Sequence, residues 1–342
     1  MIQDFEKRAH KKLKTSKTPA APGKMLVKQM ETKPVQRDDY RSYTGRLMWY
    51  VKKVAPECVN ATRELAKFMD NPGEEHWTAM TKLMGYIKTI ASRAIKLRRP
   101  RELRQYAFVD GNYGTDPDTR KSITGVVATL GGSPHTIMSK QQASVTLSST
   151  ESEYVAVATC AVEVKFAQQL MEEFETRMLR PAIVYVDNTA AIFLTNNSQV
   201  SARTKHIDIR HHFIRELVAE PNPMIQIKFV RSANNLADGC TKNIPDSILK
   251  EHCPKLVGGM LIDQVQLFNA DREDVKMSTK DDVRRDVMSS RIVSRGYRDV
   301  IKSHGTETLG GNSLDGDIQT ETPRLVHDQS NTAELYRGDC TE

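Results

Sequence analysis

The sequence predicts an α/β fold with a mixed sheet, preceded by a small helical unit and followed by a disordered tail. Between residues 104 and 262, short apolar runs typical of strands alternate with longer stretches of helical periodicity. Residues 36–100 carry apolar side chains at three- and four-residue spacing, which is typical of helices. From residue 263 to 342 the chain is poor in aromatic residues and rich in Asp, Ser, Arg and Gly, a composition typical of disorder.

The first hundred residues divide into an irregular lead-in and the helical unit. Residues 1–35 are rich in Lys, are punctuated by proline and show little periodicity, so we predict irregular structure there. Three apolar stripes, which pass through Tyr43, Leu65 and Trp77, predict three helices in the unit. Basic residues around Pro100 mark the joint to the next domain.

The domain at 104–262 is predicted to begin with strands and a long helix. The first strands are Tyr106–Asp110, Gly125–Leu130, Thr136–Met138 and Ser144–Leu147. The helix starts at Ser148 and reaches about Met178. The later strands are Ile183–Val186 and Met224–Val230, with helices at 189–196, 206–219 and 236–242. This order predicts a mixed sheet with flanking helices.

The charge of the chain is unevenly distributed. The net charge is +7, but the part from Gln264 to the end has 11 basic and 15 acidic residues, which leaves 39 basic and 28 acidic residues in the body. A basic body favours a polyanionic partner such as nucleic acid. An ordinary solvated surface is the alternative explanation.

Composition also bears on the compartment. The chain contains no uninterrupted apolar run of about 18 residues, so we expect no membrane-spanning helix and no membrane partner. The first residues lack the apolar stretch of a signal peptide, so we expect an intracellular protein, cytoplasmic or nuclear, that is not secreted. Five scattered cysteines form no C-x-x-C pair, which fits a reducing compartment and argues against a zinc site.

Four acidic residues lie where predicted strands end or helices begin. Asp110 and Asp187 each end an apolar strand, Glu153 lies in the first turn of the long helix, and Asp238 begins the last helix. Ligands of α/β sheets gather beyond the carboxyl ends of the strands. Clustered carboxylates repel one another unless a cation neutralises them, and Mg²⁺ prefers oxygen ligands. The pattern therefore predicts a site for two Mg²⁺ ions that could cleave a phosphodiester.

Helix capping is the alternative explanation for these acids. Asp187 and the asparagine after it could cap the helix that follows, and Asp238 could be an ordinary acid at a helix start. Two capping boxes overlap at residues 148–153, so either Glu151 or Glu153 is a structural residue.

Several sequence blocks resemble the ribonuclease H domain of copia-type retrotransposon polyproteins, and they occur in the same order over about 150 residues. The blocks are FVD at 108–110, DPDTRKSITG at 116–125, LSSTESEY at 147–154, VDN at 186–188, RTKHIDIR at 203–210, and LAD at 236–238 with TK at 241–242. Residues 40–48 and 68–77 are similar to the segment that joins reverse transcriptase to ribonuclease H in this family.

The resemblance implies a ribonuclease H-like five-stranded mixed sheet and a role for each acid. Asp110, Glu153, Asp187 and Asp238 match the family's metal-binding tetrad, which leaves the helix cap to Glu151. The tetrad would hold two Mg²⁺, with Mn²⁺ as the alternative ion, and hydrolyse the RNA strand of an RNA–DNA hybrid. The candidate contacts to the nucleic-acid backbone are Arg203, Lys205 and Arg210; a solvated basic helix start is the alternative.

The chain departs from the family pattern in two respects. Asn112 stands where copia-type domains usually carry a second aspartate, and we expect this exchange to weaken metal affinity. The fingers and palm of reverse transcriptase have no counterpart here, so we expect no polymerase activity, and the reverse transcriptase part of the polyprotein is an implied partner. The alternative function is a decayed or co-opted scaffold that binds nucleic acid without cutting. An integrase core is a weaker third candidate.

Overall fold

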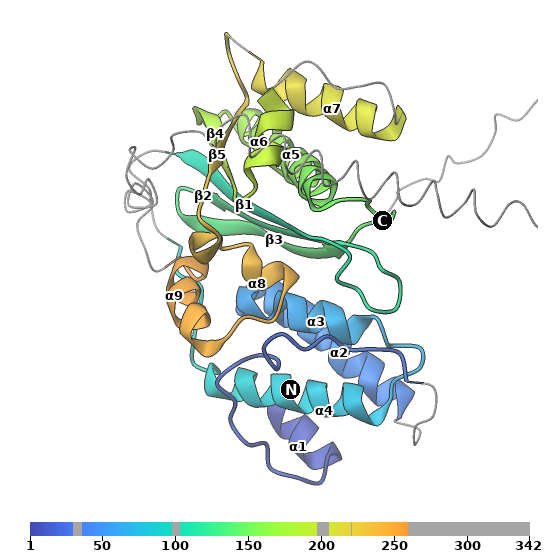
Figure 1. Ribbon diagram of the computed structural model, residues 1–342. Coiled ribbons are helices and arrows are strands. Elements are labelled where there is room, and N and C mark those ends of the chain that lie inside the picture. Colours follow the sequence, from blue (N-terminus) through green and yellow to red (C-terminus); the bar gives the residue numbers. More distant parts are fainter. Residues whose placement is uncertain (30–35, 98–102, 197–204, 220, 259–342) are drawn as a thin grey trace, which may run out of the picture. The chain divides into compact units, whose positions relative to one another are not determined.

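A computed structural model describes residues 1–29, 36–97, 103–196, 205–219 and 221–258 (Figure 1). Its centre is a five-stranded sheet in the order β3-β2-β1-β4-β5. The strands are β1 (Arg104–Asn112), β2 (Ile123–Leu130), β3 (Ser133–Gln141), β4 (Leu179–Val186) and β5 (Ile225–Phe229). β1 and β2 are antiparallel, as are β2 and β3, whereas β4 is parallel to both β1 and β5. The sheet is therefore mixed, which confirms the predicted fold class.

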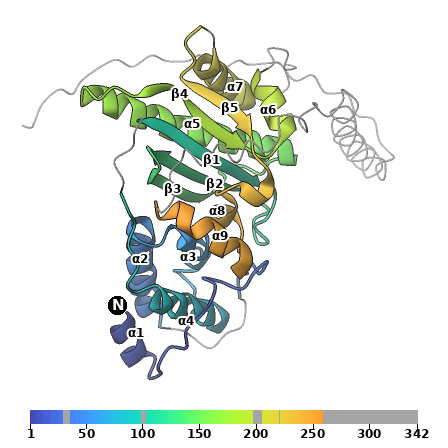
Figure 2. The same ribbon diagram turned by 90° about the vertical axis from the view of Figure 1, so that its left-hand side faces the viewer.

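Helices cover both faces of the sheet (Figures 1 and 2). One face carries α5 (Ser149–Glu173), α6 (Thr189–Asn196) and α7 (Lys205–Val218), and the other carries α8 (Asp238–Thr241), which follows the 3₁₀ turn η2 (Ser232–Asn234). The side chains of β1 contribute to the apolar cores on both faces of the sheet, because successive side chains of a strand point to opposite faces. Val109 is buried with alanines of α5, and Phe108 is buried with Leu236 and Cys240 on the other face.

The helical unit has a core of its own. It consists of α1 (Ile2–Arg8), α2 (Arg37–Lys53), the 3₁₀ turn η1 (Pro56–Cys58), α3 (Val59–Ala66) and α4 (Glu74–Thr89). Helix α1 lies within the predicted irregular lead-in, so this part of the prediction was wrong. The helix forms because Phe5 is fully buried, with its ring 4.9 Å from that of Tyr43 and 5.2 Å from that of Trp77.

Polar contacts and shared apolar packing join the helical unit to the sheet domain. The side chain of Asn60 donates a 2.9 Å hydrogen bond to Asn243, and Arg63 donates one of 2.9 Å to Ser139. The ammonium of Lys67 lies 2.6 Å from a carboxylate oxygen of Asp116, which is fully buried. In addition, the segment with α9 (Asp246–Leu256) buries two side chains in the core of the helical unit; they are Ile244 and Leu249.

Three further expectations concern a strand, the C-terminal tail and membrane-spanning helices. The predicted strand Ser144–Leu147 is wrong, because these residues form no strand. Its alternating apolar residues misled the prediction: Val145 is 50% exposed and Leu147 is 84% exposed. The predicted disorder of residues 263–342 lies outside the described residues and stays a prediction. In the part of the chain that is described, none of the helices has the length and apolar character needed to cross a membrane.

Candidate metal centre

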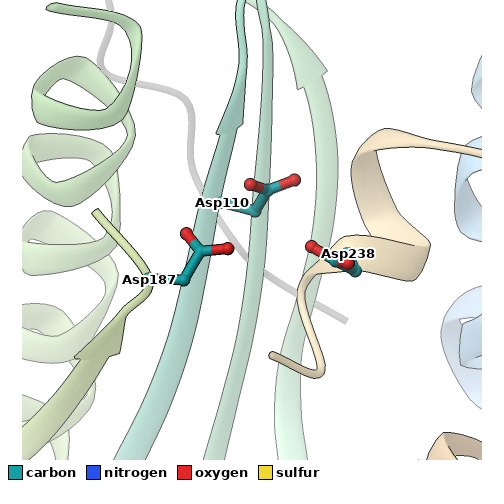
Figure 3. A group of neighbouring side chains, drawn as sticks. All are labelled: Asp110, Asp187 and Asp238. Atoms are coloured by element: carbon teal, nitrogen blue, oxygen red, sulfur yellow. The ribbon is translucent and has the colours of Figure 1, made fainter. Parts of the chain in front are cut away.

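The parallel pairing of the two central strands brings Asp110 and Asp187 next to each other. Val109 of β1 is paired with Val186 of β4, so the residues that follow them lie at the same edge of the sheet. Asp238, the first residue of α8, approaches from the other side. One carboxylate oxygen from each of the three acids lies within 4.8 Å of the others, and Figure 3 shows the three side chains converging.

The fourth predicted acid is held at the same strand end without belonging to this group of three. Glu153 is buried, and its Oε2 accepts a 3.1 Å hydrogen bond from the backbone N–H of Gly111. The capping alternative applies to its neighbour instead: Ser148 accepts from the N–H of Glu151, whose carboxylate accepts from the N–H of Leu147. The structure thus leaves Glu153 free of any capping role.

Asp187 is likewise free of the capping role that its position allowed. The side-chain oxygen of Asn188 accepts a 3.0 Å hydrogen bond from the N–H of Ala191 and caps α6. Asp187 instead accepts a 2.6 Å hydrogen bond from the hydroxyl of Ser232. Neighbouring residues thus divide two tasks, because Asn188 starts the helix and Asp187 turns toward the other acids.

Two glycines let the helices that carry Glu153 and Asp238 approach the sheet closely. A Cβ atom at Gly111 would lie 2.6 Å from the backbone carbonyl of Ser152 in α5. A Cβ atom at Gly125, the partner of Asp110 in the ladder, would lie 2.8 Å from the carbonyl oxygen of Ala237, just before α8. Both distances are shorter than real Cβ contacts, so a larger residue would displace the helix and its acid.

The Gly125→Ala substitution is expected to destabilise the protein by about 1–3 kcal/mol, because α8 would have to move. Thermal unfolding should show a decrease of several degrees in Tm. Gly45→Ala is the matched control: it lies within α2, a Cβ atom there meets nothing within 4 Å, and alanine favours helix. Equal effects at the two positions would contradict the close-approach argument.

The acids have few internal partners for their charge. The hydroxyl of Thr241 donates to Oδ2 of Asp110. The ammonium of Lys242 lies 2.9 Å from Oδ2 of Asp238. Asp238 is only 5% exposed, and its buried Oδ1 has no hydrogen-bond partner among the described residues. A buried carboxylate oxygen without a partner is costly unless a ligand binds it.

Burial and mutual repulsion disfavour the charged forms of these carboxyls. Burial, with the negative charge of Asp238, raises the pKa of Asp110 to about 6. Burial also raises the pKa of Glu153 to about 9, with the charges of Asp110 and Asp187 as the next causes. Burial raises the pKa of Asp238 as well, although Lys242 opposes this effect. A divalent cation at this point would reverse the balance, because it favours the ionised forms.

The residues present fit a magnesium site. Hard oxygen ligands, like-charged neighbours and a buried unpartnered carboxylate oxygen are what a small divalent cation would satisfy. Asn112, at the position of the family's second aspartate, donates a long hydrogen bond of 3.4 Å from its amide to the carbonyl of Thr241. An aspartate could not donate this bond, so Asn112 has a structural contact in exchange for the lost charge.

The candidate contacts to nucleic acid stay predictions. Arg203 lies outside the described residues. Lys205 and Arg210 lie in the first half of α7, where the structure describes the backbone but not the side chains.

Three residues that bind the acids were missed by the sequence analysis: Ser232, Thr241 and Lys242. The last two belong to a block of the family resemblance, which was the available signal.

A mixed sheet in the order 3-2-1-4-5, with helices on both faces and acids at the ends of its central strands, defines the ribonuclease H-like class. No profile of a known protein family matches the chain. It is 32% identical over 239 residues to the retrovirus-related Pol polyprotein of transposon RE1 of Arabidopsis thaliana, which is 70% of this chain and 16% of the relative. It is thus a homologue of copia-type retrotransposon Pol polyproteins over about 70% of its length.

A second relative and one solved structure complete the comparison. The Pol polyprotein of transposon TNT 1-94 of Nicotiana tabacum is 32% identical over 254 residues, which cover 72% of this chain. The chain spans only 16% and 19% of the length of the two polyproteins. LC11-RNase H1, isolated from compost, is 16% identical with a TM-score of 0.32, over 40% of this chain and 91% of that one.

Proposed function

We propose that this chain is a Mg²⁺-dependent ribonuclease H that hydrolyses the RNA strand of RNA–DNA hybrids. The observation that carries the proposal is the convergence of Asp110, Asp187 and Asp238 within 4.8 Å at the edge of a ribonuclease H-like sheet. Three buried or half-buried carboxylates without enough internal counter-charge are unfavourable in a purely structural role. The homology to Pol polyproteins supports the same reaction class.

The residues of the chain would share the work as follows. Asp110, Asp187 and Asp238 would hold the ions through their carboxylate oxygens, and Glu153, which accepts a hydrogen bond from the N–H of Gly111, would complete the set from the side of α5. Thr241 and Ser232 orient two of these carboxylates through their hydroxyls. A bound pair of Mg²⁺ ions would activate a water and stabilise the departing 3′ oxygen of the phosphodiester. The 2′-hydroxyl is the feature that distinguishes an RNA strand from DNA.

The test is cleavage of a labelled RNA–DNA hybrid by the purified chain. We expect fragments of the RNA strand with Mg²⁺ or Mn²⁺ and none with EDTA. Asp187→Asn and Glu153→Gln should abolish cleavage, whereas Glu151→Gln, in the same helical turn as Glu153, should retain it because Glu151 binds only the Leu147 N–H. Hybrid binding without cleavage in either metal would instead favour the decayed scaffold, and the salt dependence of that binding would report phosphate contacts.

A further inference from the structure

A lysine side chain of the same protein lies beside the cluster of three aspartates. Lys242 follows Asp238 by four residues, just after the single turn of α8, and this spacing returns its side chain to the acid. The ammonium lies 2.9 Å from Oδ2 of Asp238. This ion pair therefore places a positive charge at the site.

The hydroxyl partners of the other two acids provide no charge. Asp110 accepts from Thr241 and Asp187 accepts from Ser232, and both donors are neutral. Such hydrogen bonds stabilise a carboxylate but leave the repulsion between neighbouring acids in place. The positive charge of Lys242 opposes this repulsion directly, at the acid whose other oxygen, Oδ1, is buried without a hydrogen-bond partner in the described part of the chain.

We propose that Lys242 is the built-in counter-ion of this site, which balances the carboxylates when no metal is bound and competes with a divalent cation for Asp238. This inference rests on the proposed function, because it assumes that the acids hold metal. The side chain of Lys242 is 45% exposed, so its flexible stem can carry the ammonium away from Oδ2 into solvent. Lys242 is thus a positioning residue that sets the metal affinity of the site.

If Lys242 competes with the metal for Asp238, a neutral residue at this position should lower the stability of the metal-free protein and raise its affinity for Mg²⁺. Without the ammonium, the metal-free protein has more uncompensated negative charge, so its Tm in EDTA should fall. With metal, the repulsion between the ammonium and the cation is gone, so Mg²⁺ should bind about tenfold more tightly. A residue that only supported the structure would lower both stability and metal affinity.

The experiment compares the metal affinity of the full chain with that of Lys242→Met. Titration calorimetry with Mg²⁺ and with Mn²⁺, without nucleic acid, gives the Kd, and thermal unfolding in EDTA gives the stability. Lys242→Arg, which keeps the charge, should behave like the unaltered chain. Lys250→Met is the matched control, because Lys250 forms an i,i+4 ion pair with Asp246 in α9 and is exposed. Lys242→Gln serves as a second neutral variant if Lys242→Met does not fold.

The outcomes separate this inference from the proposed function. Tighter metal binding by the neutral variants, with a lower Tm in EDTA, supports the competition. Unchanged or weaker metal binding by these variants overturns it and leaves the proposed function intact. Where metal affinity is unchanged, a separate titration with a labelled RNA–DNA hybrid is informative: weaker hybrid binding by the neutral variants would assign Lys242 to the nucleic acid. If the unaltered chain binds neither ion, the inference and the proposed function both fail.

Discussion

The Asp110→Asn substitution is expected to make the metal-free protein more stable and to abolish cleavage. Because the pKa of Asp110 is raised from 3.8 to about 6, ionisation of this carboxyl destabilises the folded state by roughly 3 kcal/mol at pH values above the raised pKa. Asparagine removes this cost and keeps an oxygen that can accept from Thr241. The Tm in EDTA at pH 8 should therefore rise by about 5–10 °C, while cleavage with Mg²⁺ should fall by at least about a thousandfold.

The pH dependence gives this prediction a sign. A carboxyl whose pKa is higher in the folded than in the unfolded chain favours folding at low pH, and that contribution disappears as the pH rises from about 4 through about 6. In EDTA, the gain in Tm from Asp110→Asn should therefore be small at pH 4 and large at pH 8. Mg²⁺ should stabilise the unaltered chain at pH 8 and have little effect on the variant.

The control for this prediction is Asp38→Asn, because Asp38 lies in α2 of the helical unit and its side chain is 92% exposed. Its Tm in EDTA should equal that of the unaltered chain, and Mg²⁺ should raise the Tm of both proteins by the same amount. A lower Tm of Asp110→Asn in EDTA at pH 8 would contradict the view that the acids repel one another in the metal-free protein.

The Lys67→Met substitution is expected to cause the largest loss of stability, about 3–5 kcal/mol. It leaves the fully buried carboxylate of Asp116 without the ammonium that lies 2.6 Å away. Burial alone raises the pKa of Asp116, and the pKa is lowered overall because Lys67 and the N–H of Thr119 outweigh burial. The measurement is the free energy of unfolding by urea, with a decrease of roughly 10 °C in Tm as the thermal counterpart.

An exposed ion pair provides the matched comparison. Lys250 and Asp246 also lie 2.6 Å apart, but 73% of the Lys250 side chain is exposed, so Lys250→Met should cost less than about 1 kcal/mol. Adding Asp116→Asn to Lys67→Met should recover part of the loss, because the uncompensated charge is removed. Similar losses for Lys67→Met and Lys250→Met would show that burial of the first pair has no energetic weight.

The predicted parts of the fold are those with a strong apolar pattern. β1 and β4 are central strands, and their continuous apolar runs were sufficient to place them. β3 is an edge strand with mostly half-buried side chains, so its period is weak, and only Thr136–Met138 was predicted of a strand that spans Ser133–Gln141. Helix α1 was missed because a single buried ring, that of Phe5, anchors it.

The candidate site was predicted to a similar extent. Strand ends and helix starts made Asp110, Asp187 and Asp238 candidates and the family resemblance selected them; the structure brings these three side chains together, because backbone pairing determines where strand ends meet. The contact of Lys242 with Asp238 depends on a single turn of helix, and the close approach at Gly125 depends on packing across the sheet. The four-residue spacing and the family block pointed to Lys242 but did not show that its ammonium contacts the site, and the close approach at Gly125 leaves no periodic signal in the sequence.

The return of the chain after β5 into the helical unit changes what counts as the smallest stable piece. A protein shortened to start at residue 104 would expose the apolar side chains of Ile244 and Leu249 to water, at about 25 cal/mol per Å² of lost burial. It would also lack Lys67, so the carboxylate of Asp116 would lose its counter-charge. The solubility of such a truncated protein would be poor for reasons unrelated to the carboxylate site, so the sheet domain depends on the helical unit as a scaffold.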